Sequence, residues 1–389
     1  MRTESMLESI IPSVSPDSAG LSPERLQRVS ELLRGACQRG DIPGAVAAVA
    51  RRGKCVFHEA FGAAALFPER RAMTRDTLFD LASLTKVVAT LPTTLTLIDE
   101  GAIRLDDAVA RVIPEFAANG KDNITIRHAL SHTSGLIWWR DFSATCRDYD
   151  DVIAAIAGER LDYPMGSKVV YSDLNFIILG EVVRRVTGLT LDRYAADRVF
   201  APLGMQGARF CPPPELKSAC AATEYRAARD VYQCGEVHDE NAALVGGVSG
   251  HAGLFATAAD LLLYGQAWLN GGSLADAGLP GAGRILSPAV VAAATSEQTA
   301  GLNDRRALGW LMKTREFSSG GDLLSNRAYG HTGFTGTSLW VDPELELVAV
   351  LLTNRVHPTR DNNAIIRLRP RFHNLVAAAI DDWPPASAR

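Results

Sequence analysis

Hydrophobic and polar positions follow two different rhythms along the chain, and strand-like segments occur at both of its ends. Near the N-terminus, residues 44–50 and 55–61 have strand character and are joined by the hairpin-forming stretch 51–54. Four further strand-like segments lie near the C-terminus: 307–312, 327–331, 337–341 and 347–353. Between about 101 and 300, apolar residues recur mainly at helical spacing. The pattern predicts strand groups at both ends and a helix-rich middle.

Several helices can be placed by their terminal residues. Ser22-Pro23-Glu24 begins a helix, and residues 84–98 read as helical despite Pro92. Further predicted helices are 174–186, with Asp173 as N-cap and Gly188 as C′ residue, 258–269 after Thr257, a short one from Ser287-Pro288, and a last helix with Pro370 at its first position that runs to about Ile380.

These elements predict an α+β fold. We expect an antiparallel sheet built from both ends of the chain and flanked by the N- and C-terminal helices, with an inserted, mainly helical domain. The predicted sheet domain comprises residues 20–100 and 300–389, and the predicted insertion comprises residues 101–299. Active sites favour the seam between two such units.

Composition excludes several classes of protein. The chain has 389 residues, of which 47% are hydrophobic, and its 40 Lys+Arg and 44 Asp+Glu give a net charge of −4. The hydrophobic content is too high for a disordered chain, and the absence of a basic stripe argues against nucleic-acid binding. The six cysteines form no C-x-x-C pair, which favours free thiols. Glu4, Glu8 and Pro12 interrupt any secretory signal, and no apolar run reaches the ~18 residues of a membrane span. A cytoplasmic location is expected, with the periplasm as the alternative.

The first candidate for chemistry is Ser83-Leu84-Thr85-Lys86. Positions i and i+3 share one face of a helix, so the Lys86 amine can reach the Ser83 hydroxyl. A neutral amine can accept the proton of a serine nucleophile, and burial with a neighbouring positive charge would lower the pKa of Lys86 to supply that form. Ser83 at a helix start would also present backbone N–H groups to an oxyanion. The alternative is an N-cap serine and a surface lysine.

The second candidate is Tyr171-Ser172-Asp173. Tyr171 would lie in the loop before a helix, and a tyrosine beside cations can act as a base. The alternative is a half-buried core tyrosine. Tyr149-Asp150-Asp151 is a competing match, but it lacks both a preceding Pro-x-Gly turn and a following apolar helix.

The third candidate is the stretch from Gly330 to Gly336, in which His331 and Gly333 could contact a substrate. Trp138-Trp139 could form the wall of a pocket or plug the seam between domains. Weaker signals are Leu130–Gly135, which also reads as a helix end, His238-Asp239-Glu240, for which a capping role is favoured over a metal site, and Gly247–His251, which departs from the hydrolase elbow G-x-S-x-G at its last position.

In this order, Ser-x-x-Lys, Tyr-x-Asp and His-Thr-Gly resemble the three motifs of penicillin-recognising serine enzymes. The tyrosine makes the chain similar to the class C β-lactamase branch, and its character is closest to family VIII carboxylesterases. The resemblance covers about residues 20–385. It implies the β-lactamase/transpeptidase fold and no metal or organic cofactor.

The resemblance also implies roles for individual residues. Ser83 would be the acylated nucleophile, Lys86 would hold or shuttle its proton, and Tyr171 would be the base. The backbone N–H groups of Ser83 and Phe334 would form the oxyanion hole, and the segment around Asp173 and His331 would contact the substrate.

Two departures bear on the substrate. Asp173 stands where β-lactamases have Asn, and an ionised carboxylate cannot donate a hydrogen bond. His331 stands where many relatives have Lys, and histidine at pH 7 is mostly neutral. Both changes weaken the case for β-lactam or D-Ala-D-Ala recognition, and both suit an uncharged ester.

The sequence therefore predicts a serine hydrolase that forms an acyl-enzyme, with carboxylesterase action on short-chain esters favoured. The alternatives are a β-lactamase, a D,D-peptidase or D-aminopeptidase, an acyltransferase, and a catalytically silent ligand-binding or sensor domain. The expected partner is a small ester or amide substrate, not nucleic acid or a membrane. The oligomeric state stays open.

Overall fold

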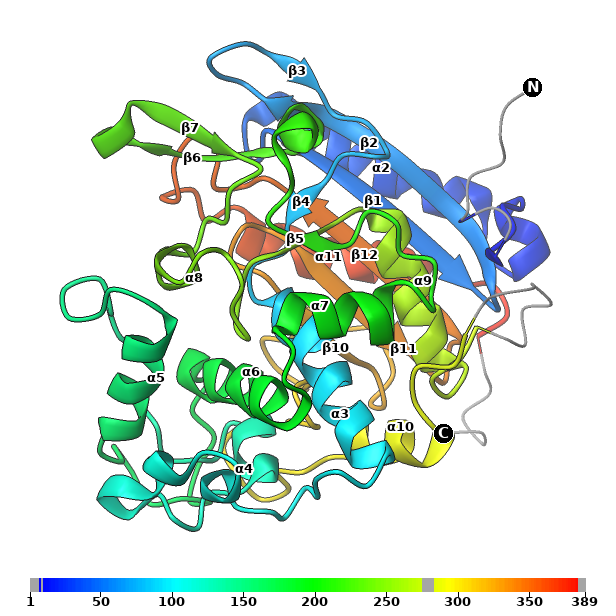
Figure 1. Ribbon diagram of the computed structural model, residues 1–389. Helices are drawn as coiled ribbons and strands as arrows, with labels where there is room; N and C mark the ends of the chain where they lie inside the picture. The colour runs from blue at the N-terminus through cyan, green and yellow to red at the C-terminus, as the bar shows by residue number, and fades with distance from the viewer. Residues whose placement is uncertain (1–6, 8–9, 275–282, 384–389) are drawn as a thin grey trace.

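Strands from the two ends of the chain form one antiparallel sheet (Figure 1). The structure is a computed structural model and describes residues 7, 10–274 and 283–383. The sheet has the order β3-β2-β1-β12-β11-β10-β9. Its strands are β1 (Gly44–Arg51), β2 (Lys54–Ala65), β3 (Arg71–Ala72), β9 (Leu311–Met312), β10 (Tyr329–Thr332), β11 (Ser338–Asp342) and β12 (Leu347–Thr353). Pairing of β1 with β12, in which Ala45 lies opposite Thr353, joins the two groups of strands.

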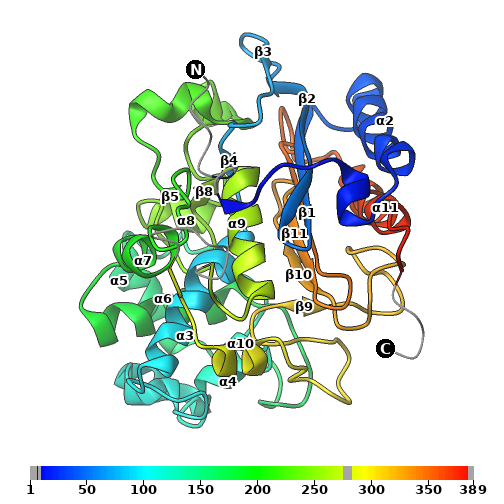
Figure 2. The same ribbon diagram turned by 90° about the vertical axis from the view of Figure 1, so that its right-hand side faces the viewer.

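Each face of the sheet is covered by helices (Figure 2). Helices α2 (Pro23–Arg39) and α11 (Ile365–Ala378) pack on one face, and α9 (Ala258–Leu269) packs on the other. Strand β1 is buried along its whole length because alternate residues point into two cores. Val46, Ala48 and Ala50 belong to the core beneath α9, and the residues between them belong to the core beneath α2 and α11. The predicted α+β fold class is confirmed.

The remaining elements lie beyond α9, on the side away from α2 and α11 (Figure 2). The helices are η2 (Lys86–Thr90), α3 (Leu91–Asp99), α4 (Ile126–Leu130), α5 (Tyr149–Gly158), α6 (Asp173–Thr187), α7 (Leu191–Ala195), η5 (Ala196–Phe200), α8 (Glu240–Leu244) and α10 (Pro288–Ala294), with short 3-10 turns at Val109–Arg111, Pro114–Gly120, Pro214–Ala219 and Ala227–Arg229. A further 3-10 turn, Pro16–Ala19, lies instead on the side of α2. A second small sheet has the order β4 (Phe79–Asp80), β8 (Leu254–Ala256), β5 (Arg209–Phe210), and β6 (Ala222–Arg226) pairs with β7 (Val231–Cys234).

The division into a sheet domain and an inserted helical domain stays a prediction. Helix α9 lies inside the range 101–299, yet it packs directly on β1, β11 and β12. The middle of the chain therefore also supplies a layer of the sheet's own core. Among the described residues, no helix is both long and apolar enough to cross a membrane. Glu4 and Glu8, on which the expected absence of a secretory signal rests, lie outside the described residues.

Two predicted helix starts are wrong. Helix α11 begins at Ile365, and Pro370 lies inside it. Ile365, Leu368 and Phe372 are buried at helical spacing, and their packing offsets the backbone hydrogen bond that Pro370 cannot donate. Helix α6 has Ser172, not Asp173, at its N-cap position. Strand β9 is also shorter than predicted, because residues 307–310 form a turn before it.

Candidate functional site

Ser83 lies in a tight turn between β4 and η2. The Asp80 carboxylate supports the turn because its Oδ1 accepts the Ala82 N–H at 2.8 Å and its Oδ2 accepts the His238 N–H at 2.6 Å. Ala82 has φ +46°, a left-handed conformation that is costly for a residue with a side chain. The strained turn places Ser83, which is partly exposed, at the start of a helical segment.

Lys86 lies one helical turn after Ser83 and is fully buried. Its Nζ contacts Ser83 Oγ at 3.1 Å, the His251 carbonyl at 3.0 Å and Asp173 Oδ1 at 2.7 Å, and it is also hydrogen-bonded to the Tyr171 hydroxyl. Burial alone would lower the pKa of Lys86, but the charge of Asp173, with a smaller contribution from Tyr171, raises it above its usual value. The prediction that the surroundings lower this pKa is wrong, because the neighbouring charge is a carboxylate. Lys86 is an ammonium ion at neutral pH.

Tyr171 lies in the loop before α6, and hydrogen bonds from the loop after α4, residues 132–138, hold this segment in place. The His132 carbonyl accepts the Val170 N–H at 3.0 Å, and His132 Nδ1 accepts the Ser172 N–H at 3.1 Å. The Trp138 carbonyl accepts the Asp173 N–H at 3.0 Å. These bonds fix the direction of the Tyr171 side chain.

The Tyr171 ring is surrounded by cations and neutral rings. Its centroid lies 5.0 Å from Lys86 Nζ, 5.6 Å from the Arg306 guanidinium carbon, and 4.7 and 5.8 Å from the rings of His132 and His331. Burial raises the pKa of Tyr171, although the Lys86 charge and hydrogen bonding to Lys86 and Ser83 oppose that rise. The structure thus brings Ser83, Lys86 and Tyr171 together.

His331 is buried on β10 and is uncharged. Burial, and secondarily the charges of Arg306 and Lys86, lower the pKa of His331 well below its usual value. Its Nδ1 donates to the Thr332 carbonyl at 2.8 Å. His331 therefore brings no positive charge to the site at neutral pH.

The turn after His331 is tied to the segment that precedes Ser83. Thr335 Oγ1 donates to the Asp80 carbonyl at 2.7 Å, and Thr337 Oγ1 donates to the Leu81 carbonyl at 3.0 Å. The approach is so close that a Cβ atom on Gly333 would lie 2.3 Å from the Leu81 carbonyl oxygen, which explains the glycine. Among the described residues, the backbone N–H groups of Ser83 and Phe334 have no hydrogen-bond partner. An oxyanion hole requires two such donors, and this assignment stays a prediction.

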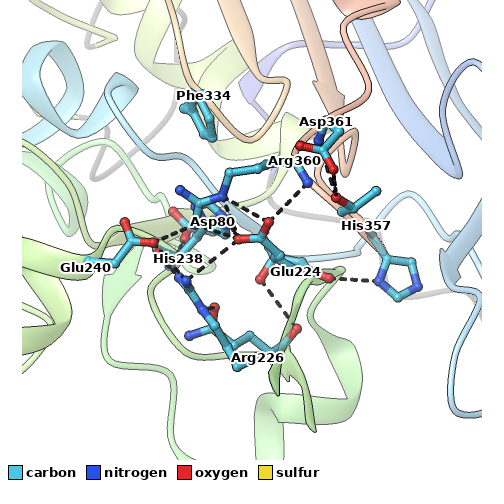
Figure 3. A network of polar contacts seen from close by, with 12 residues as sticks. Asp80, Glu224, Arg226, His238, Glu240, Phe334, His357, Arg360 and Asp361 are labelled. Atoms are coloured by element: carbon cyan, nitrogen blue, oxygen red, sulfur yellow. Dashed lines mark hydrogen bonds and ion pairs between the residues drawn. The ribbon is translucent and has the colours of Figure 1, made fainter. Parts of the chain in front are cut away.

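A network of ion pairs supports the far side of the Phe334 turn (Figure 3). Glu224 binds Arg360 Nε at 2.7 Å and His238 Nε2 at 3.1 Å, and Glu240 binds both Arg226 and Arg360. Burial would raise the pKa of Glu224, but the hydrogen bonds of His238 and Arg360 hold it far below its usual value. The His238 ring stacks on Phe334 at 5.7 Å, so the network fixes one side of the turn.

Exposed aromatic side chains border the site. Trp138 is 64% exposed, and its backbone contacts Asp173; its ring lies 5.7 Å from that of the less exposed Trp139. Phe334, which follows the His331-Thr332-Gly333 motif, is 49% exposed. Trp138 and Phe334 can offer apolar surface to a substrate, whereas no contact of Trp139 with the motif residues is seen among the described residues.

Sequence reasoning missed two histidines of the site. His132, in the stretch that reads equally well as a helix end, has φ +58°, and its ring is tilted against that of Tyr171 with the centroids 4.7 Å apart. His251, in the stretch that departs from the hydrolase elbow, contacts Lys86 through its carbonyl, and its ring lies 2.8 Å from Asp239 Oδ1. Asp239 does cap α8, as predicted. Nothing in either local sequence shows these contacts, which depend on distant segments.

A group of possible metal ligands lies beside Lys86. Atoms of Asp173, Asp239 and His251 fall within 4.8 Å of one another. Asp173 already pairs with the Lys86 ammonium, and Asp239 is bonded to the His251 ring. Because these carboxylates have partners, we assign no metal to them.

Comparisons with known proteins identify the family of the chain. The family model described as Beta-lactamase matches residues 29–371. A protein of Escherichia coli (strain K12) named "Putative D-alanyl-D-alanine carboxypeptidase" is 32% identical over 387 residues, covering 90% of this chain and 86% of its own. A relative with the same name in Salmonella agona is 31% identical, covering 90% and 87%.

Solved structures show the same fold. A penicillin-binding protein homologue from Caulobacter crescentus is 27% identical with a TM-score of 0.71, covering 91% of this chain and 98% of its own. A family VIII carboxylesterase is 24% identical with a TM-score of 0.69, covering 91% and 99%, and supports the fold alone. Matched across most of its length, the chain belongs to the β-lactamase family and is a serine hydrolase.

Proposed function

We propose that the protein is a carboxylesterase that acts through an acyl-enzyme on Ser83. Ser83 Oγ attacks the ester carbonyl carbon, and its proton passes to the couple formed by Tyr171 and Lys86. The backbone N–H groups of Ser83 and Phe334 bind the resulting oxyanion. The tetrahedral intermediate collapses, the alcohol leaves with the proton held by the couple, and water then attacks the acyl-enzyme by the same route in reverse.

The couple must lose one proton before it can accept another. Lys86 is an ammonium ion and Tyr171 is a phenol at neutral pH, since both pKa values are raised. Two interacting groups titrate as a pair, so the proton-accepting form accumulates only as the pH rises above neutral. We therefore expect kcat/KM to increase toward alkaline pH.

Asp173→Asn tests this protonation state. Removal of the carboxylate leaves burial as the main influence on Lys86, so the pKa of the couple falls and its proton-accepting form appears at lower pH. The acidic limb of the kcat/KM profile is expected to move down by about one pH unit or more, since an opposite charge at this distance typically shifts a pKa by that much. Rates measured with p-nitrophenyl acetate across the pH range give the result. An unmoved limb, or one moved to higher pH, contradicts the assignment.

The observation that carries the ester preference is the charge state of the substrate-facing motifs. His331 is neutral, and the Asp173 carboxylate is engaged by Lys86 and offers no hydrogen-bond donor. A β-lactam or an acylated D-amino acid carries a carboxylate, which binds a cation, and an acylamino group, which binds a side-chain amide. Neither motif supplies these groups. An uncharged ester needs neither, and the exposed Trp138 and Phe334 suit its apolar parts.

A second candidate is a D-alanyl-D-alanine carboxypeptidase. It is favoured by the name of the 32% identical relative and by Arg306, whose guanidinium lies beside the Tyr171 ring. Nη1 of Arg306 is buried and has no hydrogen-bond partner among the described residues. Arg306 Nε binds Asp304 Oδ2 at 2.8 Å, and its Nη1 is the cationic group that a substrate carboxylate would meet in place of the neutral His331.

Hydrolysis of a short panel of substrates distinguishes the two. The panel is p-nitrophenyl acetate and butyrate, a chromogenic cephalosporin, and an N-acylated peptide ending in D-Ala-D-Ala. Higher kcat/KM on the two esters supports the carboxylesterase. Faster release of D-alanine, or faster cephalosporin opening, replaces it with a peptidase or a β-lactamase. Product masses in the presence of added alcohol detect acyl transfer.

A further inference from the structure

Arg369 on helix α11 is a partly buried cation with an unusual partner. Its Nη2 donates to the Gly333 carbonyl at 2.5 Å, and no carboxylate pairs with it among the described residues. Its Nε is buried without a partner. Burial, with the nearby charge of Arg355, lowers the pKa of Arg369 to about 9, so the side chain is still charged at neutral pH. Removing an unpaired cation from water costs free energy, and one hydrogen bond to a carbonyl offsets only a small part of that cost.

The carbonyl that Arg369 binds belongs to the peptide unit that carries the Phe334 N–H. This peptide is not one of the two cis bonds of the described chain, and in a trans peptide the C=O and N–H point in opposite directions. A guanidinium on the Gly333 oxygen therefore fixes the direction of the Phe334 N–H on the other side. The charge also draws electrons toward that oxygen, which makes the N–H a stronger donor.

The next peptide is held in a similar way. Arg355 Nε donates to the Phe334 carbonyl at 2.7 Å, and its guanidinium carbon lies 4.3 Å from the Phe334 ring centroid. Arg355 Nη1 also binds the carbonyls of Arg360 and Asn362, so this side chain ties the turn to the loop after β12. Arg369 differs because its only hydrogen bond among the described residues is the one to Gly333.

We propose that Arg369 is a positioning residue of the oxyanion hole, acting on the reaction through the Gly333–Phe334 peptide without touching the substrate. The inference rests on the proposed function, because it assumes that the Phe334 N–H binds the oxyanion. Negative charge develops on the substrate oxygen in the transition state, so Arg369 acts on kcat more than on KM.

The test compares Arg369→Gln, Arg369→Lys and Arg369→Ala with Arg371→Gln, an exposed arginine on the same helix. Rates on p-nitrophenyl acetate are expressed per reactive site, counted with a fluorophosphonate. Loss of a direct oxyanion donor typically costs 10²–10³ in kcat, so loss of its polarising partner is expected to cost about tenfold in kcat with little change in KM. Arg369→Lys should fall between wild type and Arg369→Gln, and Arg371→Gln should match wild type. Guanidinium chloride at a few tens of millimolar should restore part of the Arg369→Ala rate.

Other outcomes overturn the inference. If Arg369 only stabilises the fold, the variants will have fewer reactive sites and a lower melting temperature, but each site will turn over at the wild-type rate without response to guanidinium. A rise in KM alone would make Arg369 a substrate-binding residue instead. A Ser83→Ala protein that keeps wild-type turnover would refute the proposed function itself. Arg369 variants with unchanged rates, in an enzyme that loses activity with Ser83→Ala, would refute only the role of Arg369.

Discussion

Ser83→Ala is expected to reduce ester turnover by about 10³-fold or more. The substitution removes the atom that becomes acylated, and loss of the nucleophile in serine hydrolases leaves only the residual rate from binding and the oxyanion hole. The kcat for p-nitrophenyl acetate at alkaline pH measures the effect. The fold should be retained, because the Ser83 side chain is partly exposed and its hydroxyl bonds only to the site residues Lys86 and Tyr171 among the contacts described.

Ser143→Ala provides the matched control. Ser143 is exposed in the loop after Trp139 and bonds to Asp141, so its loss should leave kcat unchanged. Similar circular dichroism and melting temperatures for both variants would show that the Ser83 effect is chemical. Ser83→Ala with near-normal turnover would place the nucleophile elsewhere.

Tyr171→Phe is the second substitution with a large expected effect. It keeps the ring that packs against His132 and removes the hydroxyl that is hydrogen-bonded to Ser83 and Lys86. Loss of a general base typically costs 10²–10⁴ in rate, and we expect kcat/KM to fall by that factor. Acylation and deacylation should both slow, because the same couple moves the proton in each step, and a burst of p-nitrophenol followed in a stopped-flow instrument separates them.

Tyr149→Phe is its control. Tyr149 begins the competing Tyr-Asp-Asp match, but it lies at the start of α5 and contacts Arg184. Its hydroxyl should matter for stability and not for kcat. A Tyr171→Phe enzyme with a normal rate would leave Lys86 alone as the proton carrier.

Much of the fold could be predicted because its signals are local. Strand β1 and its partner β12 are continuous apolar runs bounded by turns, and Thr257 caps α9 with its side chain, as its sequence indicates. Pro370 misled the prediction of α11, since a proline typical of a first turn is tolerated here five residues into the helix. The packing of Ile365 on the sheet extends that helix toward its N-terminus, and such packing is invisible in sequence.

The candidate site was predictable in its parts but not in its electrostatics. Ser83, Lys86 and Tyr171 each carry a local signal, and their order along the chain pointed to their convergence. The sign of the pKa change at Lys86 depends on Asp173, a carboxylate that lies in another segment of the chain. His132, His251 and Arg369 reach the site only through tertiary contacts.

The most direct test of the central claim is the mass of the covalent adduct. The wild-type protein is treated with a fluorophosphonate, or trapped with a slowly hydrolysed ester at low pH, and is then analysed as intact chain and as peptides. The mechanism predicts one added group per chain, located on Ser83 and absent from Ser83→Ala. An adduct on any other residue, or ester turnover in a protein that forms no adduct on Ser83, would contradict it.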